Sequence, residues 1–170
     1  MPYMAINLGG VALGVGIDLA FLLRWWLREK HRWGALVPFV LAKLYGMLAA
    51  LAALGAVSLL GAVTWVALWA GNLAGYLGLV WGVGGSAPDV TRARQLALTP
   101  GGYVIVFLLT IVLFGLLKWG PQQSKSKILL GCVAGVLVAL SGNVAGVAAI
   151  PLGSGVNLAG IGFTGVFGEH

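Results

Sequence analysis

Two charged residues lie inside otherwise apolar stretches of the sequence, and they are the first candidates for chemistry. Asp18 precedes Arg24 by six residues and Lys43 follows Gly34 by nine, which is about 9 Å and about 13 Å of helix measured from the same Arg-rich segment. On neighbouring antiparallel helices the two side chains therefore reach a similar depth. We predict an Asp18–Lys43 pair with a structural role. The alternatives are that both side chains extend separately toward the nearer membrane interface, or that they form a functional site, because charges inside a membrane often mark one.

Other residue types that could do chemistry are scarce. The sequence has one cysteine, Cys132, and two histidines, His31 and His170. This excludes an intramolecular disulfide and leaves too few ligands for a metal site based on Cys or His. The sequence also contains no catalytic motif and no plausible acid–base pair in one site, so we expect no enzyme activity, no cofactor and no metal. Neutral polar residues within the apolar stretches are expected to bond across helices; they are Ser58, Thr64, Asn72, Thr110, Ser141, Asn143 and Asn157.

Most other charges gather in two basic segments, 24–33 and 118–127. The first has four positive residues and one negative residue and the second has three lysines, so each has a net charge of +3. Cytoplasmic loops of membrane proteins are enriched in Lys and Arg, so we expect both segments in the cytoplasm, against anionic lipid head groups. The alternative is a basic ring lining a channel for polyanions. The basic residues are Arg24, Arg28, Lys30, Arg32, Lys118, Lys125 and Lys127.

The rest of the chain is too apolar for a soluble domain. Of 170 residues, 60% are hydrophobic and 8% are charged, whereas soluble domains have about 25% charged residues. The pattern predicts one all-α integral membrane domain with four transmembrane helices, five being the alternative. The expected elements are helices over 4–23, 35–83 (one long helix or a split one), 101–117 and 128–150, and a Gly-rich tail over 151–170 that neighbouring subunits clamp.

The charges favour four crossings over five. If 35–83 crossed twice, the basic segment 118–127 would lie outside, against the positive-inside rule. With one crossing both basic segments lie inside and both termini outside, in a multi-pass protein of the bacterial cell membrane. The surplus length of 35–83 then protrudes, re-enters or lies along the interface, and Trp65, Trp69, Tyr76 and Trp81 suit an interfacial position.

Glycine is abundant, with 28 residues against a usual share of about 7%. Glycines four residues apart share a helix face on which two backbones can touch. The pairs are Gly10 with Gly14, Gly71 with Gly75, Gly131 with Gly135, and Gly142 with Gly146. These faces exceed what one small bundle would bury, so we expect a homo-oligomer in which 131–146 forms an intermolecular strip. The alternative is packing within one monomer.

A short pattern that starts with Asn and ends with Gly recurs along the chain. It occupies residues 7–10, 72–75, 143–146 and 157–160. An internal duplication would produce such an echo, and so would chance in a chain this rich in glycine and alanine.

Residues 101–150 resemble the hairpin of conjugative pilins, with an apolar helix, a short basic loop and a second apolar helix rich in Gly and Ala. The chain is also similar in composition to small membrane proteins of actinobacterial conjugative elements and to phage holins. In the pilin family, inner-membrane subunits assemble into a tube whose lumen holds the basic loop and lipid head groups. The resemblance implies that role for Lys118, Lys125 and Lys127. The chain departs from the family in having an Arg-rich N-terminal half instead of a cleaved signal.

These features together favour a non-enzymatic, self-assembling membrane subunit of a transfer or secretion channel or of a pilus-like tube, with conjugation as one setting. The alternatives are a holin-like pore former, a small transporter, and an accessory subunit of a larger membrane complex. Membrane lipids and further copies of the chain are the expected partners. Nucleic acid is an expected partner only if the protein belongs to a transfer channel.

Overall fold

The fold is helical throughout the part of the chain that the structure describes. The computed structural model describes residues 6–29, 31–53, 58–90, 98–139, 141 and 146–167. Within these ranges no strand is present; isolated bridge residues occur, and one bridge joins Asn7 and Asp89. The predicted all-α class is therefore confirmed. The helices are α1 (Leu8–Arg28), α2 (Trp33–Ala53), α3 (Leu59–Tyr76) with its π-helical continuation η1 (Leu77–Gly82), α4 (Pro100–Trp119), α5 (Gln122–Ala139) and α6 (Gly146–Phe167).

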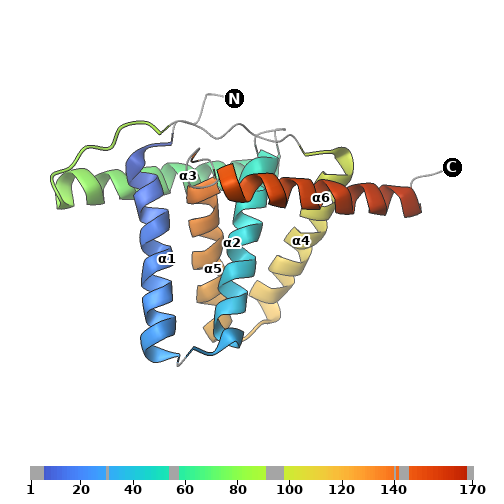
Figure 1. Ribbon diagram of the computed structural model, residues 1–170, viewed down its shortest axis with the longest axis horizontal. Helices are drawn as coiled ribbons and strands as arrows, with labels where there is room; N and C mark the ends of the chain where they lie inside the picture. Colours follow the sequence, from blue (N-terminus) through green and yellow to red (C-terminus); the bar gives the residue numbers. More distant parts are fainter. Residues whose placement is uncertain are drawn as a thin grey trace.

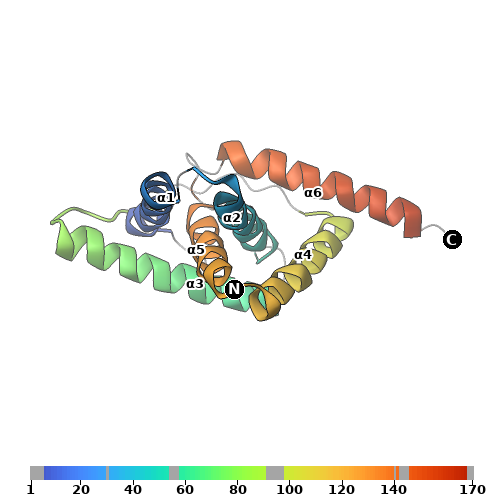
Figure 2. The ribbon, with the colours of Figure 1, turned by 90° about the horizontal axis from the view of Figure 1, so that it is seen from below.

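The helices have two orientations (Figure 1). The helices α1, α2, α4 and α5 run up or down a common direction, with α4 tilted away from the others. The helices α3 and α6 lie flat across one end of this bundle, on opposite sides of it (Figure 2). The central pair, α2 and α5, run in the same direction, α1 packs on α5, and α4 lies beside α2. The α1–α2 and α4–α5 connections, which contain the two basic segments, share the other end.

Four helical segments of the described residues are long and apolar enough to cross a membrane: α1, α2, residues 59–82 and α4. This supports an integral membrane protein. The orientation of the helices selects a different set of four parallel or antiparallel helices. Residues 59–82 lie across the bundle, whereas α5 runs beside α2. The first turns of α5 are polar and contain Lys125 and Lys127. The second apolar stretch is thus split, and Ser58 begins its second part by accepting a hydrogen bond from the Gly61 N–H at 3.0 Å.

The end of the chain corrects the sequence expectation. The predicted helix over 128–150 ends at Ala139, and the predicted tail over 151–170 is helical up to Phe167. Glycine lowers helix propensity, so the sequence of this tail does not predict a helix. The lack of side chains has a second consequence, since it lets α6 lie in direct contact with α4, and this packing offsets the low propensity.

In the first half of the chain, hydrogen bonds and a close backbone contact hold the start of α1 against α3. The Asn7 side chain caps α1 by accepting a hydrogen bond from the Gly10 N–H at 2.7 Å. The Asn7 N–H donates to the Asn72 Oδ1 at 3.3 Å, and its side-chain amide donates to the Asn72 carbonyl at 3.2 Å. Gly9 and Gly75 touch backbone to backbone, with no room for a Cβ atom on either. The contact therefore needs both the two asparagines and the two glycines.

In the second half, the start of α4 is fastened to α6 in the same way. The Thr99 hydroxyl caps α4 by accepting a hydrogen bond from the Gly102 N–H at 3.1 Å. The Thr99 N–H and hydroxyl lie 2.9 Å and 3.2 Å from the Asn157 Oδ1, to which both donate. Gly101 and Gly160 touch backbone to backbone. Asn157 thus corresponds to Asn72, and Thr99 corresponds to Asn7.

The central pair of helices completes the correspondence. Gly46 of α2 lies against the carbonyl of Cys132 in α5, and Gly135 of α5 lies against the carbonyl of Lys43 in α2. In α2, Gly46 follows Lys43 by three residues, and in α5, Gly135 follows Cys132 by three residues. Such reciprocity is the mark of a two-fold axis, which must be parallel to α2 and α5 because they run in the same direction. The described chain therefore consists of two units, α1–α2–α3 and α4–α5–α6.

The recurring pattern follows from this architecture. Residues 7–10 and 72–75 are contact partners within the first unit, and residues 157–160 are the second unit's counterpart of 72–75. Residues 143–145 lie outside the described part of the chain. The repeated contacts favour duplication over chance as the origin of the pattern.

The glycine faces expected to join different copies are used within one chain, so the alternative of intramolecular packing holds for them. The contacted residues are Asn72 for Gly10, Val138 for Gly14, Leu137 for Gly71, Gly9 for Gly75, Phe39 for Gly131 and Lys43 for Gly135. The predicted strip over 131–146 does not lie on one helix, because α5 ends at Ala139 and Gly146 begins α6. Gly142 is not among the described residues.

Candidate functional site

The predicted ion pair between α1 and α2 is present. The Lys43 Nζ donates to the Asp18 Oδ2 at 2.5 Å, and the two side chains are 24% and 17% exposed. The second carboxylate oxygen, Oδ1, is buried and has no hydrogen-bond partner among the described residues. Compensation of the Asp18 charge therefore depends on Lys43, since a buried acceptor without a partner costs free energy.

An aromatic stack separates this pair from the basic end of the bundle. Phe21 and Phe39 lie face to face with ring centroids 3.9 Å apart, and both pack around the fully buried Ala134. Phe21 follows Asp18 by three residues and Phe39 precedes Lys43 by four, so the stack is one turn closer to the basic end. A closed apolar layer at this depth suits a structural ion pair better than a path for protons.

A second ion pair joins the two basic segments. The Lys127 Nζ lies 2.7 Å from the Glu29 Oε1, and it also donates to the Ala35 carbonyl at 3.4 Å. Both charged side chains are mostly buried. From the sequence, Lys127 belongs with the other basic residues and Glu29 has no predicted role. The available signal was that Glu29 is the one acid in either basic segment.

The first basic segment is a tight turn covered by aromatic rings. The Trp25 Nε1 donates to the Arg32 carbonyl at 2.9 Å, and His31 has the left-handed φ of 59°. The His31 ring packs edge-on against Trp25 and Trp26. The predicted basic residues Arg24, Arg28 and Arg32 are exposed. Lys30 lies outside the described residues.

The second basic segment has a different arrangement. Lys118 is exposed near the end of α4 and its Nζ lies 5.3 Å from the Trp119 ring centroid. The Lys125 Nζ donates to the Lys118 carbonyl at 3.5 Å, which brings both ammonium-bearing side chains to the end of α4. Neither lysine forms an ion pair with a carboxylate in the ranges that the structure describes. Their charges are therefore available to a ligand.

A cavity of about 470 Å³ lies between α2 and α4, beside this second basic segment. Its wall includes Leu41 and Tyr45 of α2 and Val112 of α4, and Ser124 lies at its basic end. The Tyr45 hydroxyl and the Thr110 hydroxyl form a hydrogen bond of 2.8 Å across the two helices. The predicted cross-helix bonding of neutral polar residues is confirmed for Thr110, as it is for Asn72 and Asn157.

Groups of three or more residues that could hold a metal ion are absent from the described part of the chain. Its polar features are the two ion pairs, the two fastened helix starts and the basic end. Comparison with models of known protein families, with curated proteins and with solved structures finds no match to this chain.

Proposed function

We propose that this protein is a non-enzymatic integral membrane subunit that functions in a larger assembly, of the kind that forms a transfer or secretion channel or a pilus-like tube. The observation that carries the proposal is the pair of flat helices α3 and α6. Both are uncharged, both are apolar on their exposed sides, and both project beyond the bundle in opposite directions (Figure 2).

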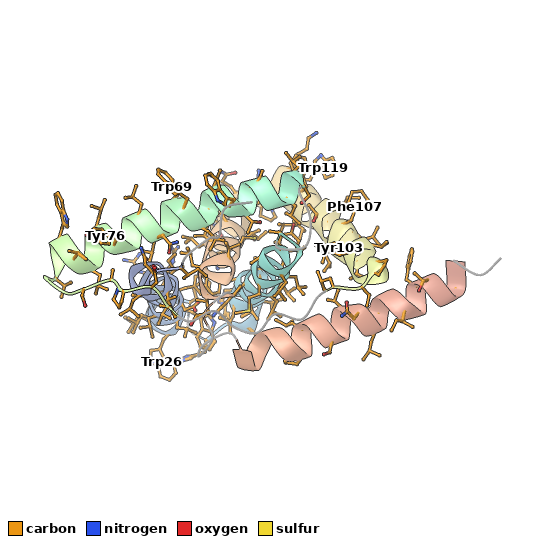
Figure 3. All side chains as sticks on the ribbon, turned by 90° about the horizontal axis from the view of Figure 1, so that it is seen from above. Trp26, Trp69, Tyr76, Tyr103, Phe107 and Trp119 are labelled. Carbon is orange, nitrogen blue, oxygen red and sulfur yellow. The ribbon has the colours of Figure 1, made fainter. Side chains whose placement is uncertain are left out.

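The exposed sides of α3 do not suit contact with water. Val63, Val66, Trp69 and Leu73 are all exposed, with Trp69 at 59% on the outer side of the helix (Figure 3). A helix at a membrane surface normally keeps a polar face toward water, whereas a helix that is apolar all round is covered by protein or lipid. The exposed residues of α6, Leu158, Ile161 and Val166, are of the same kind.

The approximate two-fold axis supports repeated assembly through these helices. Because α3 and α6 lie on opposite sides of the bundle, α3 of one copy can meet α6 of the next. A head-to-tail contact of two different surfaces closes into a ring or continues as a filament. The proposed intermolecular contact therefore uses α3 and α6, instead of the glycine faces that pack within the monomer.

The proposal includes an orientation. We infer that α1, α2, α4 and α5 cross the bacterial cell membrane, that both basic ends are cytoplasmic, and that α3, α6 and both termini lie on the outer side. The support is that segments 24–33 and 118–127 lie at the same end of the bundle and are joined by Glu29 and Lys127, as the positive-inside rule requires of cytoplasmic loops.

Single cysteines test this orientation. In a Cys132→Ala background, an impermeant maleimide applied to intact cells should label Ser86→Cys, in the loop after η1, and leave Ser126→Cys unlabelled until the cells are lysed. Both serines are exposed in the fold, so accessibility of the side chain is matched. Labelling of Ser126→Cys in intact cells would reverse the orientation.

Paired cysteines test the assembly. In the same background, Trp69→Cys with Leu158→Cys should give a ladder of cross-linked species beyond the dimer, because each copy offers both surfaces. The matched control, Leu19→Cys with Phe107→Cys on α1 and α4, has similarly exposed positions and should give no ladder. Absence of a ladder, together with a monomeric mass in lipid nanodiscs, would reject the assembly.

A small transporter is the second candidate, and the repeat favours it. Two parallel units related by an axis along the membrane normal are a common construction of transporters, and this axis runs along α2 and α5. The candidate predicts a monomer with no cross-linked ladder. A holin-like pore former would also assemble, and arrest of cell growth on expression of the chain alone would separate it from a subunit of a larger channel.

A further inference from the structure

The two units differ where a crossing helix meets the partner unit. In α1, Gly14 lies against Val138 and Leu137 of α5, so α1 and α5 are in close contact. Gly14 follows Gly10 by four residues, and the residue four positions after the corresponding Gly102 is Val106. Val106 is 2% exposed and packs with residues of α2 such as Leu48. The valine side chain holds α4 away from α2, and the tilt of α4 leaves the cavity of about 470 Å³ between them.

This cavity has the shape and the chemistry of a site for a hydrocarbon chain. It follows α2 from Val37 to Leu48, eleven residues or about 16 Å of helix. Its walls are apolar apart from groups such as the Tyr45 hydroxyl, whose hydrogen bond to Thr110 is already made. A polar ligand would find few free partners along this wall, whereas an acyl chain can fill the cavity by van der Waals contact without leaving a polar group unpaired.

The basic end of the cavity has the complementary charge for an anion. Gly120, Pro121 and Ser124 form this end. Lys125 directly follows Ser124 and Lys118 precedes Gly120 by two residues, and neither has a carboxylate partner among the described residues. At the neighbouring connection, Glu29 is already paired with Lys127. An apolar groove whose end lies next in sequence to two lysines without a carboxylate partner in the described ranges matches an amphiphile with an anionic head.

We propose that this groove binds an anionic phospholipid, with one acyl chain between α2 and α4 and its phosphate at Lys118 and Lys125. The site requires that the chain lies in a membrane, and it does not require assembly through α3 and α6. It gives a specific role to the free lysines of the second basic segment, while the arginines of the first segment remain general contacts with the membrane surface.

Native mass spectrometry of the full chain, released from nanodiscs that contain equal amounts of phosphatidylglycerol and phosphatidylcholine, tests the proposal. One phosphatidylglycerol should remain bound in preference to phosphatidylcholine. Lys118→Gln with Lys125→Gln should weaken phosphatidylglycerol binding by about fivefold for each lysine removed. The matched loss of charge in Arg24→Gln with Arg28→Gln should leave the preference unchanged. Equal loss in both double variants would mean a general basic surface, and would overturn the proposal.

A second pair of variants tests the groove itself. Val112→Trp places a large ring in the cavity and should abolish retention of either lipid, whereas Ile111→Trp changes a neighbouring exposed residue that does not line the cavity and should retain it. Retention by Val112→Trp would remove the acyl chain from the groove. If Val112→Trp fails to fold, the lysine variants still decide. Because binding is read on the monomer, loss of the lipid and loss of the cross-linked ladder are separate results.

Discussion

Gly135→Leu should prevent the folded monomer from forming, instead of dissolving an oligomer into monomers. A Cβ atom at position 135 would overlap the backbone carbonyl of Lys43, and a carbonyl cannot turn aside as a flexible side chain can. The two central helices α2 and α5 must then separate. We expect a loss of at least about 3 kcal/mol of stability, measured as a lower midpoint of thermal unfolding and as aggregation in size-exclusion chromatography with light scattering.

Two further variants sharpen this experiment. By the two-fold relation, Gly46→Leu meets the Cys132 carbonyl in the same way and should be equally damaging. Gly16→Leu is the control, because position 16 of α1 has open space around it and should behave as the unmodified protein does. A folded Gly135→Leu monomer that has lost only its higher assemblies would show that this face joins different copies after all.

Breaking the Asp18–Lys43 pair on one side should cost more than removing both charges. Lys43→Met leaves Asp18 without its partner, and the Oδ1 atom already has none among the described residues. Asp18→Asn leaves Lys43 charged in an apolar setting. Each single change should lower stability by about 3 kcal/mol, and the double change by about 1 kcal/mol or less.

The double-mutant cycle is measured by unfolding in mild detergent with increasing dodecyl sulfate. Strongly non-additive losses identify the direct interaction. If the losses of the two single variants add, the residues do not interact in the membrane. Glu29→Gln, Lys127→Gln and their double variant give the same cycle for the second ion pair, whose side chains are buried to a similar extent.

The sequence was informative where distance along a helix fixes position. Asp18 and Lys43 could be paired because both are measured from one short connection, and the rise per residue is constant in both helices. The shared end of the two basic segments followed from charge alone, and the fold places them together through Glu29 and Lys127. That particular pair could not be foreseen, because the two residues are separated by most of the chain and nothing local selects one lysine over the others.

The sequence was uninformative where packing within one chain and packing between chains would use the same residues. Spacing of glycines shows that another backbone comes close, but it does not show whether that backbone belongs to the same chain. An interfacial position for residues 59–82 was one of three alternatives and the one that the tryptophans suggested, but these residues are as apolar as a crossing helix, so composition alone did not choose among the alternatives. The contacts of Asn72 with Asn7 and of Gly75 with Gly9 set the flat orientation of α3, and they depend on residues more than sixty positions apart.

In the proposed orientation each three-helix unit crosses the membrane twice, and this even number has a consequence for how such a protein can arise and be made. A polypeptide that enters and leaves a membrane on the same side can be followed by a second copy of itself without inverting either one, so tandem fusion of one gene segment preserves orientation. The contact between α2 and α5 is reciprocal, so two identical ancestral chains could have paired through it as a homodimer. During synthesis, the first unit is completed before the second, so its α2 surface is already available when α5 of the second unit packs against it.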